Sequence, residues 1–315
     1  MKNLLLLPFF AFSISLFAQS EEESTLETAQ GSLAGVLTIP EDCNTCDVIL
    51  MISGSGPNDR DGNSNAGVKG QPFKYLSDGL VESGYATLRF DKYFSGSSTY
   101  DLPQAEADFN HFIEGFEGWL GVLLPHPQFD NIGILGHSQG AMIATIIARR
   151  QPEVDFVISL AGPGMPMDEK MTQQVMAQSA ELGENMKKAM DFIKAGEAFE
   201  GISPQIAMSL PAPTHKFLRS WMAYDPAEEI AAVEQPVLII NGTEDIQVSA
   251  QDAELLKAAQ PSAGLVMIEQ MNHILKEVEA HTSFGENFAT YSNPDLPLHK
   301  GLVPAIHNFV ESISK

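Results

Sequence analysis

Short apolar runs alternate with amphipathic segments along most of the chain. The runs at residues 47–52, 85–90, 132–135, 155–160, 236–242 and 265–268 predict strands, and residues 25–40 predict one or two edge strands. A helical spacing of apolar residues, or a cap-and-stop pattern, predicts helices over residues 75–83, 103–124, 141–150, 249–259 and 302–313. This alternation predicts an α/β fold, with a mostly parallel central sheet and helices on both faces.

The alternation is interrupted once, over residues 164–234, where the pattern is helical and contains no strong strand. We interpret this segment as a helical cap at residues 164–235, which divides the α/β core into residues 19–163 and 236–315. The segment contains eight of the thirteen methionines. Because methionine is flexible and polarizable, we expect this group to line a surface that accepts varied apolar ligands.

The first residues have the pattern of a secretory signal peptide. Lys2 is followed by an almost unbroken apolar run to Phe17, and Ala18 provides a small residue before Gln19. We expect residues 1–18 to be removed, the protein to be periplasmic or extracellular, and the mature chain to start with a flexible acidic stretch at Glu21-Glu22-Glu23. No later stretch of the sequence is apolar enough to span a bilayer.

The charge of the chain limits the kinds of molecule that it can bind, and its two cysteines indicate a disulfide. The formal net charge is −23, from 41 acidic and 18 basic residues, which argues against nucleic acid and anionic membranes as partners. Cys43 and Cys46 form a C-x-x-C turn with no second pair of ligands for a metal and no helix start for a redox motif. In an exported protein we expect a small structural disulfide.

The stretch Gly136-His137-Ser138-Gln139-Gly140 is the strongest chemical signal. It follows an apolar strand and precedes a helix, which is the context in which a G-x-S-x-G sequence exposes a nucleophilic serine. We therefore predict Ser138 as the nucleophile. The N–H of Gln139, at the helix start, points to where an oxyanion would form.

A serine nucleophile needs a base and an orienting acid, which in this architecture follow it in that chain order: serine, acid, histidine. Asp245 and His273 each lie just beyond a predicted strand and are our candidates. Glu244 and Asp225 are the competing acids. The other histidines of the C-terminal half sit in the cap, in loops or near the last helix, at positions 215, 281, 299 and 307.

A glycine-rich loop, Ser53-Gly54-Ser55-Gly56, follows the central strand at residues 47–52. We expect its Ser55 N–H to be the second oxyanion donor, with Gly54 or Gly56 as alternatives. The loop lacks the Gly-Lys-Ser/Thr of a phosphate-binding loop. A calcium reading of the following acidic residues fails because its sixth and twelfth positions are Ser64 and Gly70.

These motifs together resemble the α/β-hydrolases, in the group of secreted bacterial esterases and serine aminopeptidase-like hydrolases. The resemblance covers nearly everything after Gly35 and rests on residues 53–61, 136–140, 242–248 and 272–275. It implies a nucleophile, acid and base at Ser138, Asp245 and His273, hydrolysis of carboxylic esters, and a cap over the pocket. The chain departs from the group at residues 90–97, beside the oxyanion loop, which bears on substrate preference more than on the reaction.

The sequence therefore predicts a serine esterase that acts on a small-molecule ester through an acyl-enzyme, without a metal or organic cofactor. A peptidase or thioesterase would use the same three residues. An aminopeptidase needs acidic groups for the substrate amine, for which Glu181, Glu184 and Glu197 of the cap are candidates. A non-catalytic ligand-binding protein on this fold is the remaining alternative, and the intact set of three residues argues against it.

Overall fold

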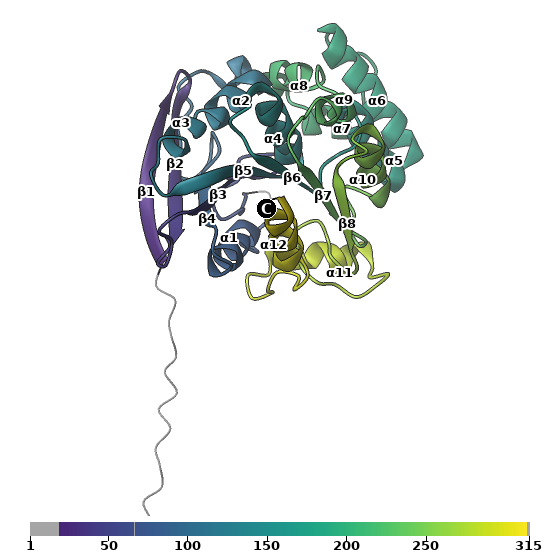
Figure 1. Cartoon of the computed structure of the whole chain (residues 1–315). Helices are drawn as coiled ribbons and strands as arrows, with labels where there is room; N and C mark the ends of the chain where they lie inside the picture. Colours follow the sequence, from purple (N-terminus) through teal and green to yellow (C-terminus); the bar gives the residue numbers. More distant parts are fainter. Residues whose placement is uncertain (1–18, 66, 314–315) are drawn as a thin grey trace, which may run out of the picture.

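An eight-stranded sheet organises the molecule, with strand order β1-β2-β4-β3-β5-β6-β7-β8 (Figure 1). The computed structural model describes residues 19–65 and 67–313, so the expected signal peptide lies outside the described residues. The strands are β1 Gln19–Thr28, β2 Gly31–Pro40, β3 Cys46–Ile52, β4 Ala86–Phe90, β5 Phe129–His137, β6 Phe156–Leu160, β7 Val237–Gly242 and β8 Gly264–Ile268.

The strands from β4 to β8 along this order are all parallel, whereas β1 and β2 form an antiparallel hairpin at one edge, with β2 antiparallel to β4. The predicted mostly parallel sheet is confirmed. The expected flexible start is wrong, because Glu21-Glu22-Glu23 lies within β1 and pairs with residues 36–38 of β2. The backbone of this edge strand bonds to β2, while the three glutamate side chains stay exposed and Glu23 pairs with Arg60 at 2.6 Å.

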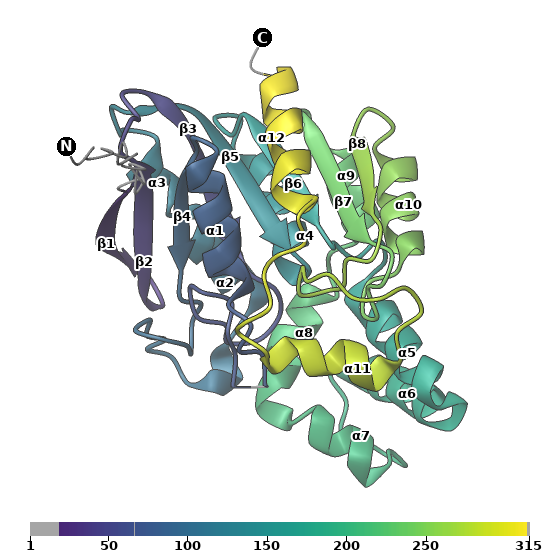
Figure 2. The ribbon, with the colours of Figure 1, turned by 90° about the horizontal axis from the view of Figure 1, so that it is seen from below.

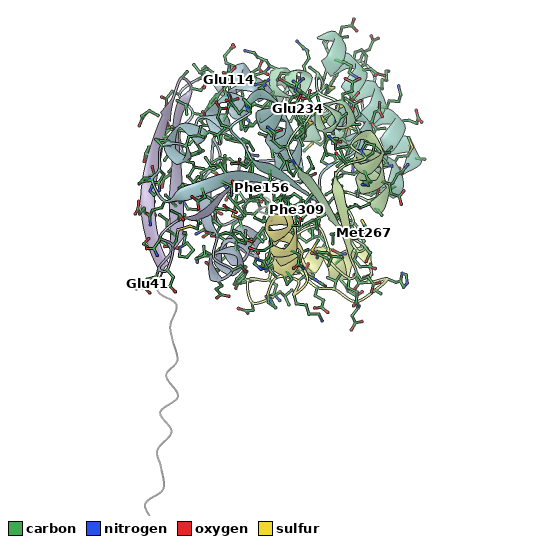
Figure 3. The ribbon with its side chains drawn as sticks, viewed as in Figure 1. Glu41, Glu114, Phe156, Glu234, Met267 and Phe309 are labelled. Carbon is green, nitrogen blue, oxygen red and sulfur yellow. A yellow bond between two sulfur atoms is a disulfide. The ribbon has the colours of Figure 1, made fainter. Side chains whose placement is uncertain are left out.

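Helices cover both faces of the sheet and create two separate apolar cores. On one face lie α1 Pro72–Glu82 and α12 Leu302–Ile313; on the other lie α2 Phe109–Glu117, α3 Leu120–Leu123, α4 Gln139–Arg150 and α10 Ala250–Ala259 (Figure 1). The ring of Phe156 in β6 lies 6.2 Å from that of Phe309 in α12, which anchors the last helix on the sheet (Figure 3).

The predicted boundaries are correct for α12 and within one residue for α10, where Ser249 forms a capping box with Asp252. Helix α1 starts three residues before the prediction, because Pro72 occupies its first turn. The continuous helix expected over residues 103–124 is wrong. This stretch contains the 3-10 turn η1 Gln104–Glu106 and then α2 and α3, which are separated at Gly118.

The segment between β6 and β7 is helical, as expected, and most of it gathers beyond one end of the sheet (Figure 2). It contains α5 Met167–Gln178, α6 Ala180–Ala195, α7 Pro204–Ser209, the 3-10 turn η2 Ala212–Thr214, α8 His215–Trp221 and α9 Pro226–Ala231. Helices α5 to α8 share an apolar cluster of their own, which includes Met186, Met190 and Met222, whereas Ile230 of α9 packs in the core between the sheet and α4. We call α5 to α9 the cap.

Cys43 and Cys46 are joined by a disulfide at the start of β3, as expected. Within the described part of the chain, every helix is too short or too polar to cross a membrane.

Candidate active site

Ser138 lies at the turn between β5 and α4, in a backbone conformation that residues other than glycine seldom adopt, with φ 55° and ψ −121°. The flanking glycines make this turn sterically possible. A Cβ on Gly136 would lie 2.0 Å from the Gly140 carbonyl oxygen, and one on Gly140 would lie 2.2 Å from that of Ile52 in β3. The turn therefore packs directly on the neighbouring strand, and the serine stands at its end.

The chain brings Asp245 and His273 together from the loops after β7 and β8. His273 Nδ1 and Asp245 Oδ2 are 2.7 Å apart, and the Asp245 side chain is completely buried. The N–H groups of Gln247 and Val248 both donate to Asp245 Oδ1, each at 2.8 Å. With Nδ1 of the ring held by the carboxylate, Nε2 is the nitrogen free to exchange a proton.

The competing acids lie elsewhere. The Glu244 carboxylate accepts the N–H of His281 at 3.2 Å, and Asp225 caps the first turn of α9 through the N–H of Ala227. Of the two neighbouring carboxylates in the Gly242-Thr243-Glu244-Asp245 loop, the structure thus places Asp245 against His273.

The glycine-rich loop after β3 passes next to the serine. A Cβ on Gly54 would be 3.2 Å from Ser138 Cβ, so the backbone approaches closely here. Among the residues that the structure describes, the N–H groups of Ser55 and Gln139 have no protein acceptor. Both residues line one cavity together with Ser138, which leaves two backbone donors available beside the serine hydroxyl.

Two cavities meet at Ser138. The larger, about 490 Å³, extends beneath the cap and is lined by apolar side chains that include Met165, Met167, Met171, Leu218 and Trp221. The smaller, about 230 Å³, holds His273 and extends toward α11 Phe284–Ala289 and the following turn, where Phe288 and Tyr291 line it.

The methionine prediction is only partly correct. Three of the eight cap methionines line the larger cavity, whereas Met186, Met190 and Met222 fill the interior of the cap and Met208 is 82% exposed.

Two buried residues of this region were not singled out from the sequence. His137 Nε2 donates to the carbonyl of His273 at 2.8 Å, and burial, with the nearby His273 as a smaller cause, lowers the pKa of His137 to about 3. The ring is therefore neutral and holds the backbone of the candidate base. Lys92, after β4, is 1% exposed, and burial lowers its pKa to about 7.

Residues 49–280 match the alpha/beta hydrolase family, and the protein belongs to that family. It is 27% identical over 261 residues to Esterase EstD of Thermotoga maritima, an alignment that covers 82% of this chain. The chain spans 61% of the length of that relative.

Solved structures share the fold at low sequence identity. Est1E from Butyrivibrio proteoclasticus superposes with a TM-score of 0.59 at 14% identity, covering 93% of this chain and 99% of that one. The Pyrococcus furiosus esterase Pf2001 gives a TM-score of 0.58 at 16% identity and covers 98% and 96% of the two chains. The thioesterase domain from the curacin biosynthetic pathway gives 0.52 at 13% identity, covering 93% and 99%. The protein is thus a hydrolase-family member with esterases among its distant relatives.

Proposed function

We propose that the protein is a serine esterase that cleaves carboxylic esters through an acyl-enzyme. The observation that carries this proposal is the Asp245–His273 hydrogen bond next to a cavity that His273 and Ser138 line together. An orienting carboxylate, a base and a hydroxyl on a strained turn form the constellation that activates a serine nucleophile.

The chemistry follows from these positions. Ser138 Oγ attacks the ester carbonyl while His273 Nε2 takes its proton, and the same nitrogen then protonates the leaving alcohol. A water molecule then attacks the acyl carbon while His273 takes a proton from it. Collapse of the second tetrahedral intermediate breaks the bond to Ser138 Oγ, which receives that proton from His273, and releases the acid. Asp245 keeps the ring in the required tautomer and stabilises its charged form.

Each tetrahedral intermediate carries its negative charge on the former carbonyl oxygen. In this proposal the N–H groups of Ser55 and Gln139 hold that oxygen. Backbone donors are fixed before the reaction, and one such donor contributes about 3–4 kcal/mol to lowering a barrier of this kind.

The lining of the two cavities favours esters over aminoacyl substrates. Glu181, Glu184 and Glu197 are exposed on the cap, and among the described residues no carboxylate lines either cavity that contains Ser138. A substrate ammonium group would therefore find no counter-charge there. The apolar cavity beneath the cap instead suits a hydrocarbon chain or ring on one side of the ester.

A panel of nitrophenyl esters of increasing acyl length, run beside aminoacyl anilides and an acyl thioester, tests the proposal. We expect kcat/KM to rise with acyl length until the cavity of about 490 Å³ is filled, and the anilides to react at least about 100-fold more slowly. Anilides or thioesters that react faster than every ester would assign the site to a peptidase or thioesterase.

We also propose that the protein is exported. The apolar run before Gln19 and the Cys43–Cys46 disulfide support this location. Expression of the full chain followed by cell fractionation and N-terminal sequencing tests it, and a chain that stays in the cytoplasm with Met1 intact would refute it.

A further inference from the structure

A lysine ammonium lies buried directly behind the glycine-rich loop. Lys92 Nζ donates to the carbonyl oxygen of Gly54 at 2.6 Å and to Oε1 of Gln139 at 3.0 Å. Both acceptors are neutral, and in the described part of the chain Lys92 takes part in no ion pair. Burial of a cation without a counter-charge is costly, and such groups concentrate at functional sites.

The first of these bonds acts on an oxyanion donor through the peptide unit itself. The carbonyl of Gly54 and the N–H of Ser55 belong to the same planar peptide and point in opposite directions. A donor that fixes the carbonyl therefore fixes the direction of the N–H. Asn58 Nδ2 is a second donor to the same oxygen at 2.9 Å, so both of its lone pairs are engaged.

A cation bonded to the Gly54 carbonyl oxygen also makes the Ser55 N–H a stronger hydrogen-bond donor. Polarisation along a hydrogen-bonded peptide makes the opposite end a better donor. Lys92 thus draws electron density toward Gly54 O and leaves the Ser55 N–H more positive.

The second bond reaches the other donor residue. An ammonium can only donate, so the oxygen end of the Gln139 carboxamide faces Lys92. Its Nε2 lies on the opposite side and has no hydrogen-bond partner among the described residues. One cation therefore links the side chain of Gln139 to the peptide unit of Ser55.

We propose that Lys92 is a positioning residue for the oxyanion hole, which holds the Gly54–Ser55 peptide and the Gln139 side chain in place and polarises the Ser55 N–H toward the developing negative charge. This inference rests on the esterase function proposed above. It assigns a role to the segment where the chain departs from the pattern of the family it resembles.

The groups around Lys92 leave its charge uncompensated. Helix α2 presents the ring of Phe116, whose centre is 5.9 Å from Nζ, and His137 is neutral. The remaining titratable groups of the packed elements are engaged elsewhere: Asp59 with Asn63, Asp91 with Arg60, Tyr93 with Thr28, His111 with Tyr100, Glu117 with Gln151, and Glu114 with solvent. Burial accordingly governs the pKa of Lys92, which lies at about 7.

The test compares wild type with Lys92→Met, which keeps the length of the side chain, and Lys92→Gln, which keeps a neutral donor. For a nitrophenyl ester we expect kcat to fall by about 10²–10³-fold in Lys92→Met, the range for loss of an oxyanion donor, with KM changed less than about threefold. Lys92→Gln should lie between Lys92→Met and wild type. Lys300→Met, at a side chain that is 81% exposed, is the matched control and should match wild type.

The pH profile of kcat distinguishes this role from a purely structural one, because replacing a structural residue would not change the shape of that profile. Wild-type kcat should decline as the pH rises through the pKa of Lys92, whereas both variants should lack this upper limb. If Lys92→Met does not fold, Lys92→Gln carries both measurements.

Two results would overturn the inference while leaving the esterase proposal intact: a Lys92 variant with kcat within threefold of wild type, or identical upper limbs in wild type and variants. Wild-type protein that hydrolyses no ester would instead refute the proposed function itself.

Discussion

Ser138 stores strain that the surrounding backbone imposes. Its positive φ is maintained by the turn between β5 and α4 and by the N–H of Ser138, which donates to Leu160 O in β6 at 2.9 Å. Strain of this kind costs on the order of 1–3 kcal/mol, and it persists because the flanking glycines leave the chain no roomier path. The hydroxyl is thereby held at the carboxyl edge of the sheet, beside the loop that contains Ser55.

The identity of the acid can be decided by two neighbouring substitutions. Asp245→Asn should lower kcat by about 10⁴-fold, because an amide donates to His273 Nδ1 and so favours the wrong tautomer. Glu244→Gln is the matched control and should stay within about threefold, since the Glu244 carboxylate faces the backbone of His281. Steady-state kinetics on one ester measures both. The reverse pattern would move the acid to Glu244.

The burial of Lys92 also predicts how the free energy of unfolding changes with pH. Its pKa is lowered from 10.5 to about 7 by burial, so between these values the unfolded chain binds a proton that the folded protein has released. Stability from this group should therefore rise with pH across that window, by at most about 1.4 kcal/mol per pH unit. We expect the free energy of unfolding of wild type, relative to Lys92→Met, to increase between pH 7 and pH 9 in urea titrations. A difference that is constant with pH would contradict the lowered pKa.

At the residue scale, the sequence located side chains whose position follows from strand ends. Ser138, Asp245 and His273 each follow an apolar run, and parallel strands bring their carboxyl ends to one edge. Lys92 also follows a strand, but its contacts with Gly54 and Gln139 depend on how three loops pack. A lysine in a loop is usually solvated, so its type and position alone did not reveal a buried role.

At the scale of elements, a buried ion pair attaches the cap to the core. Lys170 of α5 donates to Asp252 of α10 at 2.6 Å, and Asp252 also accepts the N–H groups of Gly164 and Ser249. The two side chains are 7% and 0% exposed. This contact joins the first cap helix to the helix after β7, next to the apolar cavity that Lys170 also lines.

Replacement of Lys170 should therefore lower the free energy of unfolding substantially. Lys170→Ala leaves Asp252 buried without its cation, and we expect a loss of about 3–5 kcal/mol in the free energy of unfolding. Lys187→Ala removes an ion pair on α6 whose partners are 62% and 63% exposed, and should change the same quantity by less than about 0.5 kcal/mol. Urea unfolding at pH 7 compares the two. Equal effects would mean that the buried pair does not anchor the cap.

Elements with strong local signals were the ones that the sequence predicted well. The parallel strands each contain a short apolar run, and α10 and α12 have a clear cap or a strong apolar period. Helix α11 is only six residues long, which is too short for a clear apolar period, and the glutamates of β1 face solvent while its backbone pairs with β2. The pairing of β1 with β2, and the contact of Asn287 in α11 with the Glu244 carbonyl, do not show in the apolar pattern of either segment.

At the scale of the whole molecule, the faces of the sheet form the apolar cores and its carboxyl edge carries the candidate active site. Its two faces are buried under helices. Its carboxyl edge lies next to the cap (Figure 2), and the loops that follow β3, β4, β5, β7 and β8 at this edge contain Ser55, Lys92, Ser138, Asp245 and His273. The alternation of strands and helices predicted this division, because parallel strands need crossover helices on both faces. The size of the two cavities did not follow from the sequence, since it depends on how the cap helices and the α11 segment pack over the edge.

The central claim is that Ser138 is the nucleophile of an ester hydrolase, and covalent labelling tests it most directly. Wild type incubated with a fluorophosphonate should gain the mass of one phosphonyl group. Peptide mapping should place this group on the peptide that contains Ser138, and the loss of ester hydrolysis should be proportional to the fraction of protein labelled. Ser138→Ala, with an unchanged circular dichroism spectrum, should gain no label and hydrolyse no ester. Full turnover by this folded variant, or a label on another residue with loss of activity, would contradict the account.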